Sequence, residues 1–363
     1  MLLWIDGFDD YGASYGGSAY PLNSLLRRWA HCVDVESHYY TADPQLDVNG
    51  RAIQFHGDNL VLTAPDLTTE ATMVVGFRYQ HGADVAATIL ALLDGCDSDT
   101  PTVFLKVNDS YYLEVWRNDA EPVLLATSTD PINTAAWYYV ELKVVCDATS
   151  AGSVELHLNG AEAFPAYTGV TKTDQQSDDY NTTFRLQNGV SQQSLFDDLY
   201  CLDSYDLNSD GSNTAFLGPR CVYTILPAAD VEGEQWLCSF GFDHYAMVRD
   251  EWGTDDDATY VWTNEDWVSD FYTCDTLPEG VTGINGIMLV ADVRKTESGA
   301  GTRNFTLLVY SESGEGGEMW NGNTVSLDNT LWKSYWGICE YDPGTWAAWE
   351  SGNLAAAQIG FSS

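Results

Sequence analysis

Phe196-Asp197-Asp198-Leu199-Tyr200 is the stretch from which the fold is best read. It repeats, almost unchanged, the phrase Phe8-Asp9-Asp10-Tyr11 near the start of the chain. Both phrases combine aromatic residues with aspartates, and both lie among residues that favour strands. We therefore expect them to be the first and last strands of one domain, lying side by side in one sheet.

Between the two phrases, short apolar runs alternate with turn residues. The clearest runs cover residues 72–79, 89–93, 102–107 and 111–116. Strands of this length, separated by glycine, asparagine and aspartate, are typical of an antiparallel sandwich.

Residues 137–145 and 153–160 are expected to form a hairpin within this sandwich. One face of the first strand carries Tyr138, Val140, Leu142 and Val144, and the other carries Tyr139, Glu141 and Lys143. The second strand alternates in the same way and ends in Asn-Gly, a favoured turn dipeptide. We expect the apolar row to pack against the opposite sheet and the polar row to face water.

Three of these features together resemble a known family. Trp137 with Glu141, the run 154–160 and the closing stretch 196–200 look like the recurrent phrases of the concanavalin A-like lectin/glucanase jelly roll in its laminin-G-like form. The resemblance implies an all-β chain. A concanavalin A-like antiparallel jelly-roll sandwich would occupy residues 1–218, and a second β-rich, sandwich-like domain would occupy residues 219–363.

The second domain shows the same pattern of aromatic-rich expected strands separated by glycine-containing turns. Residues 284–294 and 304–310 are expected to form a hairpin, and residues 266–272 and 355–361 are expected to be strands. Phe240-Gly241-Phe242-Asp243 faintly echoes the opening phrase, so a diverged copy of the first domain stays open.

Two further stretches, residues 3–11 and 216–220, resemble bacteriophage virion proteins that pair such a jelly roll with a second β-rich domain. This resemblance implies a viral structural protein, either a tail protein or a capsid decoration. It would be assembled in the host cytoplasm and displayed on the virion exterior. Its partners would be other virion proteins and further copies of itself in a homo-oligomer.

The charge of the chain excludes several classes of partner. Acidic residues number 54 against 15 basic ones, which gives a formal net charge of −39. Such a surface repels nucleic-acid phosphates and anionic lipids, so neither nucleic acid nor a membrane is expected as a partner. The first residues do not read as a signal peptide, and no apolar run approaches the roughly 20 residues that span a bilayer.

The cysteines and histidines give no metal or redox motif. The eight cysteines show no C-x-x-C spacing, and we expect mostly buried free thiols rather than disulfides. The six histidines are spread along the chain, so no metal-ligand role is expected for any of them.

One candidate metal site follows the closing stretch. Asp206, Asn208 and Asp210, with Gly211, have the spacing of the first half of a calcium loop. Leu217 stands where the bidentate carboxylate is expected, which favours a plain linker of aspartate and asparagine turns. No cofactor is expected, and the open alternative is Ca²⁺ or Mg²⁺ from the medium in this loop.

No catalytic motif is found. Glycosidases on this jelly roll present carboxylates from one strand in a pattern such as E-x-D-x-x-E, and no expected strand carries it. Serine-hydrolase, zincin and phosphate-loop motifs are absent from the sequence as well. The sequence therefore predicts a protein that is not an enzyme and acts through protein-protein contacts.

Tryptophans concentrated late in the chain are the remaining functional signal. Candidate ligand or interface residues are Trp320, Trp332, Trp336, Trp346 and Trp349. Tryptophan is enriched at protein interfaces, but sugars also stack on such rings. The alternative function is therefore a carbohydrate-binding adhesin that recognises host surface glycans.

Overall fold

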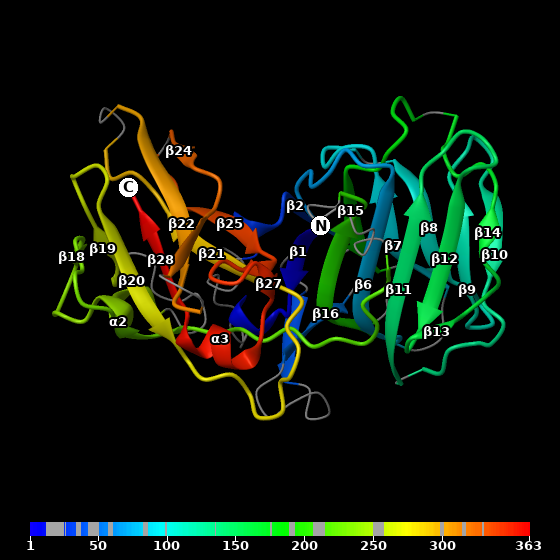
Figure 1. The fold of residues 1–363 in the computed structure, drawn as a ribbon. Helices are drawn as coiled ribbons and strands as arrows, with labels where there is room; N and C mark the ends of the chain where they lie inside the picture. The colour runs from blue at the N-terminus through cyan, green and yellow to red at the C-terminus, as the bar shows by residue number, and fades with distance from the viewer. Residues whose placement is uncertain are drawn as a thin grey trace. The chain divides into compact units, whose positions relative to one another are not determined.

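The structure, a computed structural model, divides the chain into the units Met1–Tyr223 and Thr224–Ser363 (Figure 1). The described residues are 1–11, 25, 27–33, 38–42, 51–56, 61–82, 86–98, 100–134, 136–174, 176–188, 193–205, 215–249, 258–297, 301–313, 317–328 and 330–363.

Two antiparallel sheets form the first unit. Over the described residues, sheet A has nine strands, in the order β13 (Ala161–Glu162), β12 (Ser153–Leu158), β11 (Trp137–Val145), β6 (Thr72–Gln80), β16 (Gln193–Asp203), β4 (Arg51–His56) and β3 (His38–Ala42), with β1 (Leu2–Asp6) on β16 and β14 (Tyr167–Thr168) on β12. Sheet B likewise has seven, in the order β10 (Val123–Thr127), β9 (Leu113–Arg117), β8 (Pro101–Val107), β7 (Ala87–Leu93), β15 (Thr183–Gln187), β5 (Val61–Thr63) and β2 (His31–Val33). The predicted all-β jelly-roll class is confirmed.

The opening and closing segments do lie side by side. β1 pairs antiparallel with β16, with Trp4 opposite Cys201 and Asp6 opposite Leu199. The opening phrase itself differs from the prediction, because Asp9–Tyr11 forms a 3-10 turn (η1) and not a strand. This turn carries Tyr11 back to Asp6, whose buried carboxylate accepts a hydrogen bond from the Tyr11 hydroxyl (2.5 Å).

Aromatic side chains fill the space between the layers at this end of the first unit. The Trp29 ring lies edge-on to Trp4 (centroids 5.5 Å apart) and to Phe184 of β15 (5.9 Å), and it stacks on Phe8 (6.2 Å). Each of these four side chains is almost fully buried. The opening strand is therefore held by packing onto the opposite sheet as well as by backbone pairing.

The predicted hairpin of residues 137–160 is present as β11 and β12, with Leu142 opposite Leu156. Val140, Leu142 and Val144 of its apolar row are buried, as expected, and Tyr138 is half-buried. The prediction that the polar row faces water is wrong, because Tyr139 and Glu141 are buried on the outer face of sheet A. A later part of the chain, residues 216–222, covers them.

We call residues 216–222 the covering segment. Its backbone amides donate hydrogen bonds to sheet A: Leu217 to the Tyr200 hydroxyl (3.2 Å), Gly218 to Glu141 Oε1 (2.8 Å) and Val222 to Asp198 Oδ1 (2.6 Å). The expected domain boundary after Gly218 therefore falls inside a segment that belongs to the first unit.

The second unit is built around sheet C. Over the described residues it has six strands, β17 (Pro227–Asp230), β20 (Ser269–Cys274), β28 (Gln358–Ser362), β22 (Arg303–Ser311) and β23 (Glu318–Asn321) in that order, with β24 (Val325–Leu327) on β22. The smaller elements are the pairs β18 (Leu237–Cys238) with β19 (Val261–Trp262), β21 (Ile287–Val293) with β25 (Lys333–Cys339) and β26 (Tyr341–Asp342) with β27 (Ala347–Ala348), and the helices α2 (His244–Val248) and α3 (Ser351–Ala356).

The second predicted hairpin is wrong. β21 pairs with β25, whereas β22 pairs with β28, β23 and β24. The two predicted partners instead face each other across the core, where Leu289 of β21 joins Phe305 and Val309 of β22 in one apolar cluster. Strands adjacent in sequence usually pair, and here the apolar face of β21 is buried against sheet C instead.

No helix among the described residues has the length and apolar character needed to cross a membrane.

Gly76 of β6 gives a test of the packing on sheet A. It lies opposite Tyr200, and a Cβ at this position would come within 2.2 Å of Tyr200 Cε1. We expect Gly76→Ala to lower the free energy of unfolding of the first unit by about 1–3 kcal/mol, the usual cost of overpacking. Urea denaturation followed by tryptophan fluorescence measures the change.

Gly283→Ala, in the second unit, is the control for the substitution itself, because no atom lies within 4 Å of a Cβ added there. An unchanged unfolding free energy for Gly76→Ala would show that the Tyr200 ring does not pack on this glycine.

Candidate functional site

The predicted calcium ligands Asp206, Asn208 and Asp210 lie outside the described residues. The calcium loop therefore stays a prediction from the sequence.

The five predicted tryptophans do not form one surface. Trp349 is only 1% exposed, belongs to the core of the second unit and donates from Nε1 to the Cys339 carbonyl (3.1 Å). Trp320 and Trp336 are half-buried on β23 and β25. Trp320 packs against the same core, and the inclusion of Trp349 among ligand residues is corrected.

The remaining two differ from each other. Trp332 is half-buried, and the Arg294 guanidinium lies over its ring at 4.7 Å from the centroid. Trp346 is 74% exposed, in the turn between β26 and β27. Trp346 is therefore the most exposed side chain of the predicted set.

Trp267, which the sequence analysis did not single out, is the most exposed tryptophan of the described residues, at 91%. Residues 266–272 were expected to be a strand, but β20 begins only at Ser269. Trp267 lies in the preceding turn with φ +68°, in the left-handed region that a bulky residue rarely adopts.

Backbone and side-chain hydrogen bonds fix the Trp267 turn, residues 265–268, to Ser363. Trp267 N–H donates to the Ser363 carbonyl (2.9 Å), and Ser363 N–H donates to the Val268 carbonyl (3.0 Å). The Ser363 hydroxyl donates to the Glu265 carbonyl (2.8 Å). The indole of Trp236 adds a bond to Val268 O (3.2 Å). The turn therefore holds the Trp267 ring in solvent on a rigid base.

Trp346 is held in a comparable way by Asp342. Its backbone has φ +56°, and its N–H donates to the Asp342 carbonyl (2.7 Å). The buried Asp342 carboxylate accepts from Gly344 N–H (3.0 Å), from Thr345 Oγ (3.1 Å) and from Asn353 Nδ2 (2.8 Å). Burial alone would raise the pKa of Asp342, but hydrogen bonds from Ser311 and Ser313, and then from Gly344 and Thr345, hold it below the ordinary value.

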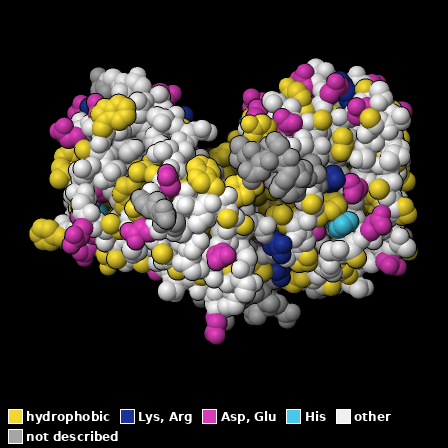
Figure 2. Space-filling model, viewed as in Figure 1, with side chains coloured by type: hydrophobic (Ala, Val, Ile, Leu, Met, Phe, Trp, Pro, Cys, Tyr) yellow, Lys and Arg dark blue, Asp and Glu magenta, His cyan; other side chains and the backbone are white. Residues whose placement is uncertain are grey.

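Charged groups flank Trp267. Arg303 Nη1 lies 2.7 Å from Asp266 Oδ1, and both side chains are accessible to solvent. Figure 2 shows that acidic side chains outnumber basic ones over the face in view, in keeping with the net charge of −39. An approaching ligand therefore meets an aromatic ring, one ion pair and a negative surface.

Sheet A carries a connected group of buried ionisable side chains in the first unit. The Tyr200 hydroxyl donates to Glu141 Oε1 (2.5 Å), the Tyr139 hydroxyl donates to the Asp198 carbonyl (3.2 Å), and Arg78 Nε lies 2.8 Å from Asp198 Oδ2. Burial raises the pKa of both phenols, so they stay protonated hydrogen-bond donors. The covering segment lies over this group, which therefore has a structural role as it stands.

Asp197 is a further buried carboxyl group of this region. Burial and then the neighbouring Asp198 charge raise the pKa of its carboxyl group. Burial also raises the pKa of Asp198, although Arg78 opposes the shift. Asp197 therefore keeps its proton at pH values where an exposed aspartate has lost it.

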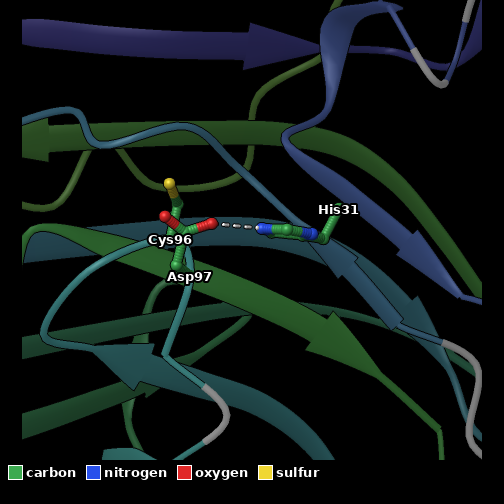
Figure 3. A group of neighbouring side chains, drawn as sticks. All are labelled: His31, Cys96 and Asp97. Atoms are coloured by element: carbon green, nitrogen blue, oxygen red, sulfur yellow. Dashed lines mark hydrogen bonds and ion pairs between the residues drawn. The ribbon is translucent and has the colours of Figure 1, made fainter.

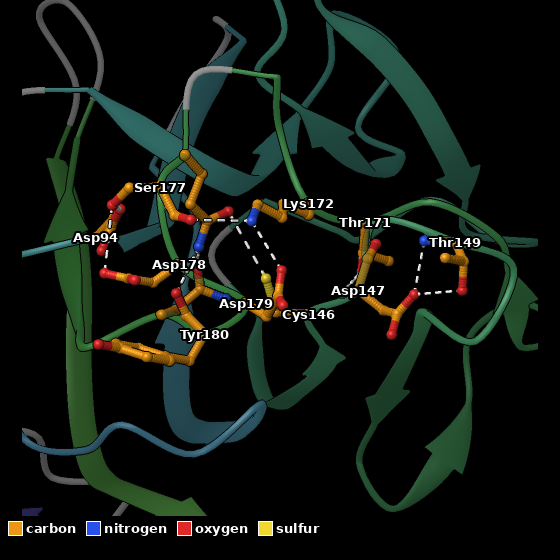
Figure 4. Close-up of polar contacts among 12 residues, drawn as sticks. Asp94, Cys146, Asp147, Thr149, Thr171, Lys172, Ser177, Asp178, Asp179 and Tyr180 are labelled. Atoms are coloured by element: carbon orange, nitrogen blue, oxygen red, sulfur yellow. Dashed lines mark hydrogen bonds and ion pairs between the residues drawn. The ribbon is translucent and has the colours of Figure 1, made fainter.

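A second acidic group lies in the loop that precedes β15 (Figure 4). Lys172 Nζ bonds to Asp179 Oδ1 (2.7 Å) and to the Ser177 carbonyl (3.1 Å). The Ser177 hydroxyl lies 3.2 Å from Asp178 Oδ2 and 3.5 Å from Asp94 Oδ2. Lys172 offsets part of the negative charge and fixes the loop. We therefore assign this group a structural role.

No protein-family model and no curated protein matches the chain. Solved structures resemble it over about half its length. A glucuronan lyase from Trichoderma reesei is 11% identical, covers 48% of this chain and 91% of its own, and has a TM-score of 0.39. An alginate lyase from Aplysia kurodai is 9% identical, covers 56% of this chain and 99% of its own, and has a TM-score of 0.43. A carbohydrate-binding module from Bacillus subtilis is 9% identical, covers 45% of this chain and 93% of its own, and has a TM-score of 0.30.

At these identities the likeness concerns the β-sandwich fold alone. It does correct one prediction, because lyases and sialidases are among the similar structures. The conclusion that the chain is not an enzyme is wrong, since a missing glycosidase carboxylate pattern excludes one catalytic arrangement only. Nothing in the comparisons supports a phage origin.

Asp197 predicts how the stability of the first unit depends on pH. In the unfolded chain this carboxyl group ionises near its ordinary pKa of about 3.9, whereas the folded unit keeps it protonated to higher pH. Folding is therefore penalised increasingly as the pH rises above about 4. We expect Asp197→Asn to be more stable than the wild type at pH 8, with a smaller difference at pH 5, in urea denaturation.

Asparagine keeps an oxygen for the bond from Asp198 N–H (2.7 Å), so the backbone need not change. Asp174→Asn is the control, because that side chain is exposed in the same unit. A stability difference that is equal at both pH values would contradict the assignment.

Proposed function

We propose that the second unit binds glycans and that the indole of Trp267 is the platform on which a sugar ring stacks. The observation that carries the proposal is the combination of 91% exposure with a left-handed backbone fixed by Ser363. Sugar rings present apolar C–H faces to aromatic rings, and tryptophan offers the largest such face.

The backbone conformation argues for function and against chance exposure. A non-glycine residue in the left-handed region costs of order 1–3 kcal/mol, and such strain gathers at ligand-binding sites. Burial of the Trp267 side chain does not offset this cost, because the ring faces solvent. A smaller residue or a glycine would serve the fold better at this position.

Polar groups beside the ring suit sugar hydroxyls. The Asp266 carboxylate accepts hydrogen bonds and the Arg303 guanidinium donates them, and both flank the Trp267 turn. A ring face with a few placed polar groups is the usual composition of a small-ligand site. Trp346, fixed through Asp342, offers a second ring of the same kind.

The charge selects the class of glycan. With a net charge of −39, the chain repels uronates and sialic acids over distances of about a Debye length, roughly 8–10 Å in physiological salt. Neutral oligosaccharides carry no such penalty, so they are the proposed ligands. A virion role stays a prediction from the sequence resemblance, and a glycan-binding surface would suit a virion protein as well as any other adhesin.

A glycan array with the labelled full chain tests the proposal. We expect binding to neutral oligosaccharides, and we expect Trp267→Ala to weaken it at least about tenfold, as for an aromatic residue that dominates a binding surface. Trp267→Phe should retain part of the affinity because a ring remains.

Phe242→Ala is the matched control, since that ring is 96% exposed in the same unit without the bonds to Ser363. Wild-type affinity in Trp267→Ala, binding to anionic glycans alone, or no binding on the array would each overturn the proposal.

A further inference from the structure

His31, Cys96 and Asp97 come together in the first unit, although Cys96 lies 65 positions after His31 in the sequence. His31 begins β2, at the edge of sheet B, and the other two lie in the turn that follows β7. One ligand atom from each residue lies within 4.8 Å of the other two. Figure 3 shows the His31 ring directed at Asp97, with Cys96 beside it.

The hydrogen bond between two of these residues arranges them for a cation. His31 Nε2 lies 2.9 Å from Asp97 Oδ1. This contact keeps an imidazole nitrogen and a carboxylate oxygen facing each other, and a metal ion can take the place of the proton between them.

The turn that carries Cys96 is fixed from several sides. Cys96 N–H donates to Asp66 Oδ1 (2.7 Å), and Gly95 N–H donates to Thr182 Oγ (2.7 Å). Arg185 Nη2 donates to the Ser98 carbonyl (2.7 Å). The positions of the thiol and of the Asp97 carboxylate therefore follow from sheet B, and binding an ion requires little ordering of the backbone.

We propose that His31, Cys96 and Asp97 form a binding site for a divalent transition metal of the Zn²⁺ class. One nitrogen, one sulfur and one oxygen ligand suit this class, whereas Mg²⁺ and Ca²⁺ prefer oxygen alone. Zn²⁺ bond lengths of about 2.0–2.3 Å in a tetrahedron place ligand atoms about 3.5 Å apart. Separations of up to 4.8 Å therefore close with small side-chain rotations.

Three protein side chains leave the fourth position on a tetrahedral metal for water or for a bound small molecule. The Asp66 carboxylate beside Cys96 adds negative charge that favours a cation at this place. The site lies wholly within the first unit, so it is independent of glycan binding by Trp267.

Cobalt titration of the full chain tests the site, because a cobalt-thiolate bond gives a charge-transfer absorption band in the near ultraviolet. We expect one Co²⁺ per chain, a thiolate band, and displacement of the ion by Zn²⁺. Cys96→Ser should remove the band, and His31→Ala should weaken Co²⁺ binding at least about tenfold, as loss of a metal contact does.

Cys221→Ser is the matched control, because Cys221 is an exposed thiol of the same unit that is not part of the cluster. Thermal unfolding of each variant shows that it folds. A band that persists in Cys96→Ser, a band lost in Cys221→Ser, or no saturable binding by the wild type would overturn the proposal.

Discussion

The first unit depends on the backbone pairing of β16. This strand bonds to β6 and β4 within sheet A and also receives β1, so it joins the opening of the chain to the middle of the sandwich. Its ladder is interrupted between Asp197 and Tyr200, where Asp198 adopts φ +48°. This bulge directs the Asp198 carboxylate to Arg78 and to the Val222 amide, and the covering segment follows from it.

Comparable backbone strain has different consequences in the two units. At Asp198 the unfavourable conformation is offset by an ion pair and by hydrogen bonds inside the fold. At Trp267 the same kind of conformation presents a ring to solvent, and Ser363 holds it there. The strain at Asp198 is therefore explained by contacts within the folded unit. For the second case, Trp267, we propose a ligand, and the proposed function therefore rests on the second unit.

The sequence predicted the elements whose signals are local. Alternation identified the hairpin of β11 and β12. The two aromatic and aspartate phrases led to the correct expectation that the opening and closing segments pair, although the opening strand β1 precedes its phrase. Sequence-based prediction failed where segments distant in sequence determine the environment of a residue or strand. Glu141 was expected in water because nothing near it in sequence indicates that residues 216–222 return to cover it. Likewise β21 and β22 look like a hairpin, yet the core of the second unit places them in different sheets.

The candidate sites were harder to predict for the same reason. The positive φ of Trp267 depends on its hydrogen bonds to Ser363, which lies 96 positions later in the sequence. No sequence motif indicates this conformation. His31, Cys96 and Asp97 follow no ligand spacing, because a sheet edge and a turn bring them together. Trp346 was singled out from composition alone and is exposed, while Trp349, three positions later, belongs to the core.

Nuclear magnetic resonance of the indole N–H groups tests the central claim most directly. The chain is labelled with ¹⁵N-tryptophan, the Trp267 signal is assigned by its loss in Trp267→Phe, and a neutral oligosaccharide is added in steps. The account predicts a progressive shift of the Trp267 signal while that of the buried Trp349 stays in place. A fixed Trp267 signal, with shifts confined to tryptophans of the first unit, would contradict it.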